Sequence, residues 1–318
     1  MRDWAELLRV SALFTVPGDA LAGAAATGMR PGRGTAYAVG ASLCLYEAGM
    51  ALNDWADRDE DAVERPHRPI PSGRIPPAAA LGAAGLLTAA GLTLAARAGR
   101  PALAVASALA ATVWAYDLRL KHTPAAPAGM AAARALDLVL GATATMSVPY
   151  GQKPAEPDRP PVTESAKLAS LTVPQARHSV TPGAVLRIGT PAAALAAHTY
   201  TVTAVSRHEA YGGSTRTPLA ALGATTTLGL LLAHTRATAR PLAALAAAAY
   251  VRTSALPYLH AALNPSAPLT QRAVGGGIRA VIPLQAALAA RSGARVTPLA
   301  VLGLAPMARA LARKVSPT

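Results

Sequence analysis

The sequence contains little cysteine, few aromatic side chains and few charges. Its 318 residues include one cysteine, Cys44, and one phenylalanine, and charged residues make up 14%. A single cysteine excludes a disulfide within the chain and argues against a cysteine-based metal site. None of the seven histidines has the H-x-x-x-H or H-E-x-x-H spacing of a helical metal site. We therefore expect no histidine metal ligand, and interpret four of them as polar groups at helix ends or in a cavity: His122, His198, His208 and His260.

Apolar residues fill most of the remaining sequence. Hydrophobic residues make up 52% of the chain, and the mean hydropathy is +0.30. Apolar runs recur about every 20–30 residues, which is the spacing of membrane-spanning helices. They are rich in alanine, which is nearly neutral toward the bilayer, so single spans are weakly marked. We predict an all-α polytopic membrane protein with nine or ten transmembrane helices in these ranges: 10–27, 35–52, 78–96, 101–116, 128–148, 187–205, 218–234, 240–259, 274–290 and 297–313.

Basic residues exceed acidic ones, which gives a formal net charge of +14. They are spread over many short interhelical segments and are not gathered on one face with aromatic stacking partners, so we expect no nucleic-acid partner. Contact with membrane lipid head groups or with an anionic substrate fits this distribution better.

Four polar segments separate the apolar runs: 53–77, 117–127, 206–217 and 264–277. Each follows an even-numbered span, so all four are predicted at the same end of a single domain, 1–318. We assign that end to the cytoplasm and the protein to the plasma membrane, because the first segment is rich in charge. Residues 149–186 have no helical periodicity and are rich in Pro, Ser and Thr, which predicts a long extracytoplasmic loop inserted in this domain.

The first polar segment begins with NDWADRDEDAVE, residues 53–64. Residues three, four and seven apart share a face of a helix, so a helix continuing from the preceding span aligns four oxygen-bearing side chains: Asn53, Asp54, Asp57 and Asp61. Asp59 and Glu60 point elsewhere. Stacked carboxylates repel one another, and a divalent cation such as Mg²⁺ or Mn²⁺ offsets the repulsion. The alternative is a solvated acidic loop; an EF-hand is excluded, because Ala62 and Arg68 stand where Gly and Glu are needed.

The segment then turns basic and rich in proline, with RPHRPIPSGR at residues 65–74. The prolines exclude a regular helix there. A stiff loop that carries arginines beside an acidic helix suits a metal-bound diphosphate, because guanidinium groups bind phosphate oxygens in pairs.

These two stretches resemble a known family. NDWADRDED matches the N-D-x-x-D-x-x-x-D signature of the UbiA superfamily of intramembrane prenyltransferases at every fixed position, and RPHRPIPSGRI is similar to the segment that follows it. The resemblance implies a ring of transmembrane helices around a central cavity, and transfer of a prenyl group from a polyprenyl diphosphate to an aromatic or other electron-rich acceptor. It also implies Mg²⁺ as the cofactor. Three aspartates are then catalytic and bind the metal together with Asn53: Asp54, Asp57 and Asp61. Arg65 and Arg68 bind the diphosphate.

Two further elements resemble the family less specifically. YDLRLKHT is similar to its Tyr…Lys element, which implies that Tyr116 and Lys121 bind the diphosphate. MAAARALDLVLG resembles its fifth span, where Arg134 and Asp137 correspond to an Arg and usually an Asn at the substrate. The alternatives are an interfacial Tyr and Lys at a helix end, and an intrahelical ion pair.

One departure from the family is large. Its second acidic motif, typically D-x-x-x-D after the sixth span, is missing, and SRHEAYGG stands in its place. Glu209 is the one acidic residue there, so we expect it to act as a base or to orient the acceptor, while Arg207 contacts the diphosphate and replaces or weakens a second Mg²⁺ site. This pattern is similar to the divergent EboC-like branch found in bacterial secondary-metabolite clusters.

The missing motif leaves a second function open. In this alternative, the chain is a non-catalytic isoprenoid-binding protein or an export component of a secondary-metabolite system. A CDP-alcohol phosphotransferase is not favoured, because its motif requires a Gly soon after the first aspartates and the chain reads Arg58-Asp59 there.

Overall fold

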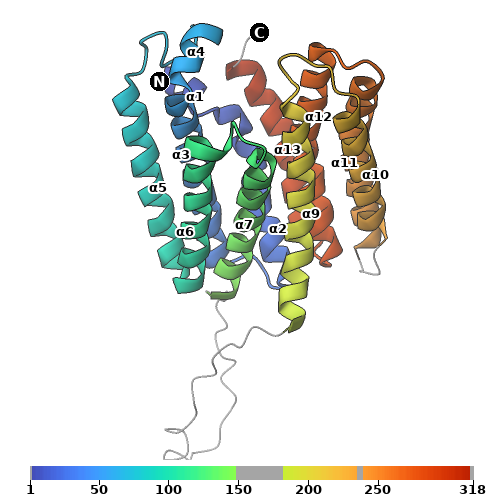
Figure 1. The fold of residues 1–318 in the computed structure, drawn as a ribbon. Coiled ribbons are helices and arrows are strands. Elements are labelled where there is room, and N and C mark those ends of the chain that lie inside the picture. The colour runs from blue at the N-terminus through green and yellow to red at the C-terminus, as the bar shows by residue number, and fades with distance from the viewer. Residues whose placement is uncertain (1, 148–181, 235–238, 316–318) are drawn as a thin grey trace, which may run out of the picture.

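The computed structural model describes residues 2–147, 182–234 and 239–315 (Figure 1). These residues form helices and turns, and no β-strand occurs among them, which confirms the all-α class. Most of the predicted loop 149–186 lies outside the described residues. Its last five residues belong to a helix that begins at Pro182, so that end of the predicted loop was wrong; proline is well tolerated in the first helical turn because its missing N–H has no helical partner there.

The helices follow one another along the chain with short connections. In order they are α1 (Arg2–Leu7), η1 (Val10–Thr15), α2 (Pro17–Ala26), α3 (Arg33–Ala56), α4 (Arg58–Glu64), α5 (Pro77–Ala98), α6 (Arg100–Ala115), η2 (Tyr116–Leu120), α7 (Ala126–Ser147), α9 (Pro182–Ser206), α10 (Arg216–Ala233), α11 (Arg240–Leu263), α12 (Ala267–Arg291) and α13 (Val296–Val315). Each predicted span overlaps a helix, except that the span predicted at 10–27 is divided between η1 and α2. Within the described ranges, four stretches are long and apolar enough to cross a membrane by length and composition, so the predicted number of nine or ten spans is not confirmed: α5, α6 with η2, α11 and α12.

The most buried of these four stretches is α12. Over its most apolar 18 residues, 83% of the α12 residues are buried, whereas the buried share of the corresponding stretch of α5 is 22%. α12 packs against α2, α9, α11 and α13, and α5 packs mainly against α3. The peripheral helices therefore present apolar outer faces, as expected where lipid tails take the place of water.

α2 and α7 cross at very short range because glycines face each other's backbone. A Cβ atom on Gly23 would lie 1.9 Å from the Leu138 carbonyl oxygen, and one on Gly141 would lie 2.2 Å from the Ala20 carbonyl oxygen. Small residues permit such close helix contact in membrane proteins. This crossing fixes the position of α7, which carries two of the predicted substrate-binding residues.

The polar segments gather at one end of the bundle. Figure 1 shows α4 and the turns that follow η2, α9 and α11 at the upper end. Their common location confirms the prediction from span parity. The segment predicted at 264–277 is shorter than expected, because α12 already begins at Ala267 and only 264–266 lie outside a helix.

Candidate functional site

The helix predicted over residues 53–64 is interrupted at one residue. α3 ends at Ala56 and α4 begins at Arg58, with Asp57 between them at φ −89° and ψ 3°. The backbone N–H of Asp57 still donates to the Asn53 carbonyl at 2.9 Å, and that of Asp61 donates to Asp57 at 2.8 Å. The interruption therefore preserves most of the predicted face, and Asp54 and Asp61 are both buried.

Arginines from two segments pair with the two buried aspartates. Arg9 Nη2 lies 3.0 Å from Asp54 Oδ1. Arg68 Nη1 lies 2.6 Å from Asp61 Oδ2 and 3.5 Å from Asp54 Oδ1, and Arg65 Nη1 lies 3.2 Å from Asp61 Oδ1. The basic loop after the acidic helix thus folds back onto it, which brings Arg65 and Arg68 to the predicted carboxylates.

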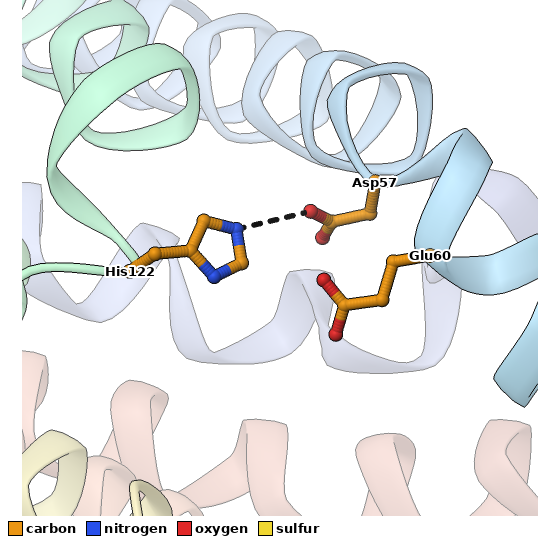
Figure 2. A group of neighbouring side chains, drawn as sticks. All are labelled: Asp57, Glu60 and His122. Carbon is orange, nitrogen blue, oxygen red and sulfur yellow. Dashed lines mark ion pairs between the residues drawn. The ribbon is translucent and has the colours of Figure 1, made fainter.

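Asp57 belongs to a more accessible group. Lys121 Nζ forms an ion pair with its carboxylate, and His122 Nε2 lies 3.7 Å from Asp57 Oδ1 (Figure 2). One ligand atom each from Asp57, Glu60 and His122 lie within 4.8 Å of one another. Glu60 therefore lies beside Asp57 instead of pointing elsewhere, because residues three apart share a helix face. His122 lies in the turn after η2, at a helix end as predicted, and the expectation that it binds no metal stays a prediction. Two carboxylates and an imidazole within this distance fit a divalent cation.

Asn53 connects this site to two residues that the sequence analysis missed. Its Nδ2 donates to Asp117 Oδ1 at 3.2 Å, and its Oδ1 accepts from Arg9 Nη2 at 3.3 Å. Arg9 has φ 48° and ψ 48°, a left-handed conformation that is unusual for a residue with a side chain. Asp117 follows Tyr116 in the quoted YDLRLKHT element, whereas nothing in the local sequence marks Arg9, because its partners lie 44 and 45 positions away.

A cavity of about 540 Å³ extends from this end into the bundle. Its mouth is polar and includes Arg9, Asn53, Tyr116, Asp117 and Glu209. Below the mouth, the lining is mostly apolar, with Tyr46 and Thr203 as polar exceptions, and comes from several helices: Gly49, Met50, Leu109, Val113, Val202 and Val274.

The opposite end of the cavity is polar again. Ser42 Oγ donates a hydrogen bond to Asp137 Oδ1, and both residues line the cavity. Arg134 Nη1 lies 2.8 Å from Oδ2 of Asp19, whose carboxylate is fully buried and does not line the cavity. Gln285 Nε2 donates to Asp19 Oδ1 and to the backbone carbonyl of residue 15, each at 2.6 Å. The sequence analysis identified Arg134 and Asp137 but missed the partners, which come from other helices.

Arg207 and Glu209 separate in the structure. Glu209 lines the cavity mouth, and its burial raises the pKa of its carboxyl group, although the nearby Arg65 opposes this shift. Arg207 Nη1 instead donates to the Thr123 carbonyl at 2.6 Å and does not line the cavity. Arg207 therefore ties together the turns that follow α9 and η2.

Comparison with known proteins identifies relatives of one kind. A model of the UbiA prenyltransferase family matches residues 11–205. The digeranylgeranylglyceryl phosphate synthase of Methanopyrus kandleri is 35% identical over 160 residues, which cover 49% of this chain and 55% of that protein. The bacteriochlorophyll synthase 33 kDa chain of Rhodobacter capsulatus is 70% identical over 27 residues, 8% of this chain and 9% of that one. The chain thus spans about half the length, or less, of the curated relatives it matches.

Solved structures of similar fold cover nearly the whole chain. A UbiA homologue from Aeropyrum pernix K1 aligns with a TM-score of 0.58 and 17% identity, over 87% of this chain and 96% of that one. A structure described as a digeranylgeranylglyceryl phosphate synthase in membranes aligns with a TM-score of 0.56 and 13% identity, over 92% of this chain and 98% of that one. At these identities the likeness establishes the fold.

Proposed function

The chain belongs to the UbiA prenyltransferase family, and from that premise we propose that it transfers a prenyl group from a polyprenyl diphosphate to an aromatic or other electron-rich acceptor inside a membrane. Its apolar helices and its family mark it as an integral membrane protein. The observation that carries the proposal is a group of paired acidic and basic side chains beside the cavity, which Asn53 and Arg9 connect to its polar mouth and its largely apolar interior. A diphosphate with an isoprenoid tail has that same polarity along its length.

The oxygen-bearing side chains of the acidic motif provide a suitable set of Mg²⁺ ligands. We assign the ion to four of them: Asn53, Asp54, Asp57 and Asp61. Glu60 and His122 lie beside Asp57 and are close enough to contribute. Mg²⁺ supplies neutralising charge to the diphosphate when bound. The oxygen donors of the motif support this assignment, because Mg²⁺ prefers carboxylate and carbonyl oxygens. Among the described residues, the three whose ligand atoms lie within 4.8 Å of one another are Asp57, Glu60 and His122.

Basic side chains beside the cavity mouth bind the diphosphate in this proposal. Arg65, Arg68 and Lys121 currently pair with the aspartates, so they lie within reach of a group that enters between them. When the allylic C–O bond breaks, its electron pair stays on the diphosphate, and these cations with the Tyr116 hydroxyl stabilise the developing charge. The apolar lining keeps water from the allylic cation.

The acceptor side of the reaction is assigned to the cavity itself. Glu209 lies at the mouth with a carboxyl group whose pKa is raised by burial, which suits a group that takes a proton from the acceptor or orients it. Arg134 and Asp137 line the far end. We place the motif-bearing end in the cytoplasm and the protein in the plasma membrane, in line with the charge of the first polar segment.

A second candidate function rests on the missing acidic motif. Only Glu209 stands where the family has a pair of acids, which favours the EboC-like branch and permits a non-catalytic isoprenoid-binding or export role. Both functions require a prenyl-diphosphate or isoprenoid site, and they differ in whether the allylic bond is broken.

The test is binding of prenyl diphosphates to detergent-purified protein. Geranyl, farnesyl and geranylgeranyl diphosphate are titrated by calorimetry in Mg²⁺ or in EDTA, and release of diphosphate is followed with a set of electron-rich acceptors. We expect Mg²⁺-dependent binding that Asp57→Asn abolishes or weakens at least tenfold. Binding without any release of diphosphate points to the second function, and binding indifferent to metal and to the substitution contradicts both.

Asp59→Asn is the matched control. Asp59 lies two residues after Asp57, in α4, but its side chain is 89% exposed and pairs only with Arg58 at 3.6 Å among the described contacts. The control removes the same charge from α4 without touching the cavity mouth, so its donor affinity should equal that of the wild type.

A further inference from the structure

A charged side chain stands at the middle of α11, one of the stretches long and apolar enough to cross a membrane. α11 spans Arg240–Leu263, and Arg252 lies twelve residues after its first residue and eleven before its last, about 17–18 Å from both ends. The hydrocarbon core of a bilayer is about 30 Å thick, so Arg252 lies near its centre. A stem of three methylene groups is too short to carry the guanidinium from there to the head groups.

Arg252 points away from the rest of the protein. Its two neighbours in the sequence mark the contacts of α11 with the flanking helices: a Cβ on Gly229 of α10 would lie 2.2 Å from Val251 Cγ2, and a Cβ on Gly276 of α12 would lie 3.2 Å from the Thr253 carbonyl oxygen. Arg252 lies between these two contacts around the helix and is exposed. Among the described residues, none forms an ion pair or a hydrogen bond with it.

Exposed leucines share the face of α11 that carries Arg252. The face follows intervals of seven, four, three and four residues, which is the heptad spacing of a helix–helix contact. We call it the α11 seam and define it by five exposed residues: Leu245, Arg252, Leu256, Leu259 and Leu263. An outward stripe of leucines suits lipid tails, but an ionisable group within a membrane span is costly, and such groups almost always pair. The seam therefore lacks a partner for its arginine.

A second copy of this chain does not supply that partner through a twofold contact. Copies in one membrane have the same orientation, so such a contact brings both Arg252 side chains to the same depth, where like charges oppose association. Glu47 is a half-buried carboxyl near the middle of α3. However, α3 packs against α2, α5, α6 and α7, on the other side of the bundle from α10 and α11 (Figure 1). The complementary charge has to come from a different protein.

We propose that the α11 seam binds a membrane-spanning helix of another protein that carries an aspartate or glutamate near its midpoint. The carboxylate accepts paired N–H groups from Arg252, and the leucines of the seam pack against apolar residues on either side of it. The charge makes the seam selective, because a wholly apolar helix leaves the guanidinium unpaired. This interaction surface lies outside the cavity and does not depend on the proposed function.

Synthetic transmembrane helices that differ at one central residue test this selectivity. Each has a leucine–alanine core of about 20 residues, lysines at both ends, and Glu, Gln or Leu at the centre. The full-length protein, with a donor fluorophore on a C-terminal tag, is reconstituted with acceptor-labelled peptide in phosphatidylcholine vesicles, and energy transfer is measured against the peptide-to-lipid ratio. We expect the Glu peptide to bind about tenfold more tightly than the other two, the gain of a charge-assisted hydrogen bond.

Arg252→Leu removes the charge and completes the apolar stripe, so we expect the three peptides to bind this variant equally. Arg252→Glu with a Lys-centred peptide reverses the pair and should bind about as well as the wild type binds the Glu peptide. Leu256→Ala should weaken all three peptides by a similar factor, because it removes packing from the seam. Arg97→Leu is the control and should leave the order unchanged, since Arg97 is exposed near the end of α5, on the opposite side of the bundle (Figure 1).

Two kinds of result overturn the inference once gel filtration has shown that the variants fold. One is equal affinity of the wild type for the three peptides, or an Arg252→Leu variant that still prefers the Glu peptide. The other is energy transfer between two differently labelled populations of the chain that Arg252→Leu abolishes, because a second copy then occupies the seam. Donor binding tests the proposed function at a separate site, so each proposal can fail alone.

Discussion

Lys121 allows a prediction in which one substitution has opposite effects on two ligands. Its ammonium pairs with Asp57 and its side chain is 9% exposed, while that of Asp57 is 16% exposed. Among the described residues its Nζ has no hydrogen-bond partner beyond that ion pair. A cation that binds Asp57 has to displace Lys121, whereas a diphosphate gains a contact from it. Lys121→Met keeps the length of the side chain and removes its charge.

The expected size follows from the ion pair. Two unit charges about 4 Å apart interact by about 4 kcal/mol at an effective dielectric constant of 20. Partial exposure and the neighbouring His122 reduce this, so we expect Mn²⁺ alone to bind Lys121→Met more tightly by about 1–2 kcal/mol, roughly 5–30-fold. The donor loses a charge-assisted hydrogen bond of about 1.5–3 kcal/mol, so its affinity in the presence of metal falls about 10–100-fold.

Two titrations on the same protein measure these effects. Electron paramagnetic resonance of free Mn²⁺ gives the metal affinity, and calorimetry gives the donor affinity at saturating metal. Arg119→Met is the control, because Arg119 is exposed on the same η2 segment. If the metal affinity falls, or if both affinities change in the same direction, Lys121 does not have the role described here.

Two further substitutions test the fold around the site. Gly23→Ala places a Cβ 1.9 Å from the Leu138 backbone oxygen, which cannot move aside, so we expect this substitution to destabilise the protein by about 1–3 kcal/mol. Gly82→Ala is the control: its Cβ meets nothing within 4 Å, so the substitution should be neutral or stabilising. Thermal unfolding in detergent distinguishes the two. Arg74 hydrogen-bonds Asp3 and holds the pKa of that carboxyl below its usual value. The pairing therefore stabilises α1 above the unfolded pKa of about 4 and is lost as the pH falls through the lower folded value, so Arg74→Ala should remove that acid-dependent part of α1 protection in hydrogen exchange.

Local sequence was sufficient to predict the helices and the acidic motif. Apolar runs of about 20 residues form helices in a membrane because backbone groups must bond within the segment. The spacing of Asp54, Asp57 and Asp61 placed them on one face for the same local reason. The interruption at Asp57 was not predictable from spacing, and neither was the position of His122 near Asp57 and Glu60, because it depends on how the turn after η2 packs.

The sequence by itself determined the helical class, the family and the acidic motif, because each of these depends on residues within a few turns of one another. Only the tertiary structure decided which cations meet those carboxylates and what closes the far end of the cavity. Arg9 reaches Asp54 across 45 positions and Gln285 reaches Asp19 across 266. Contacts of that kind depend on how whole helices pack, and the close α2–α7 crossing at Gly23 and Gly141 that positions Asp19 beside Arg134 has no periodic pattern in the sequence.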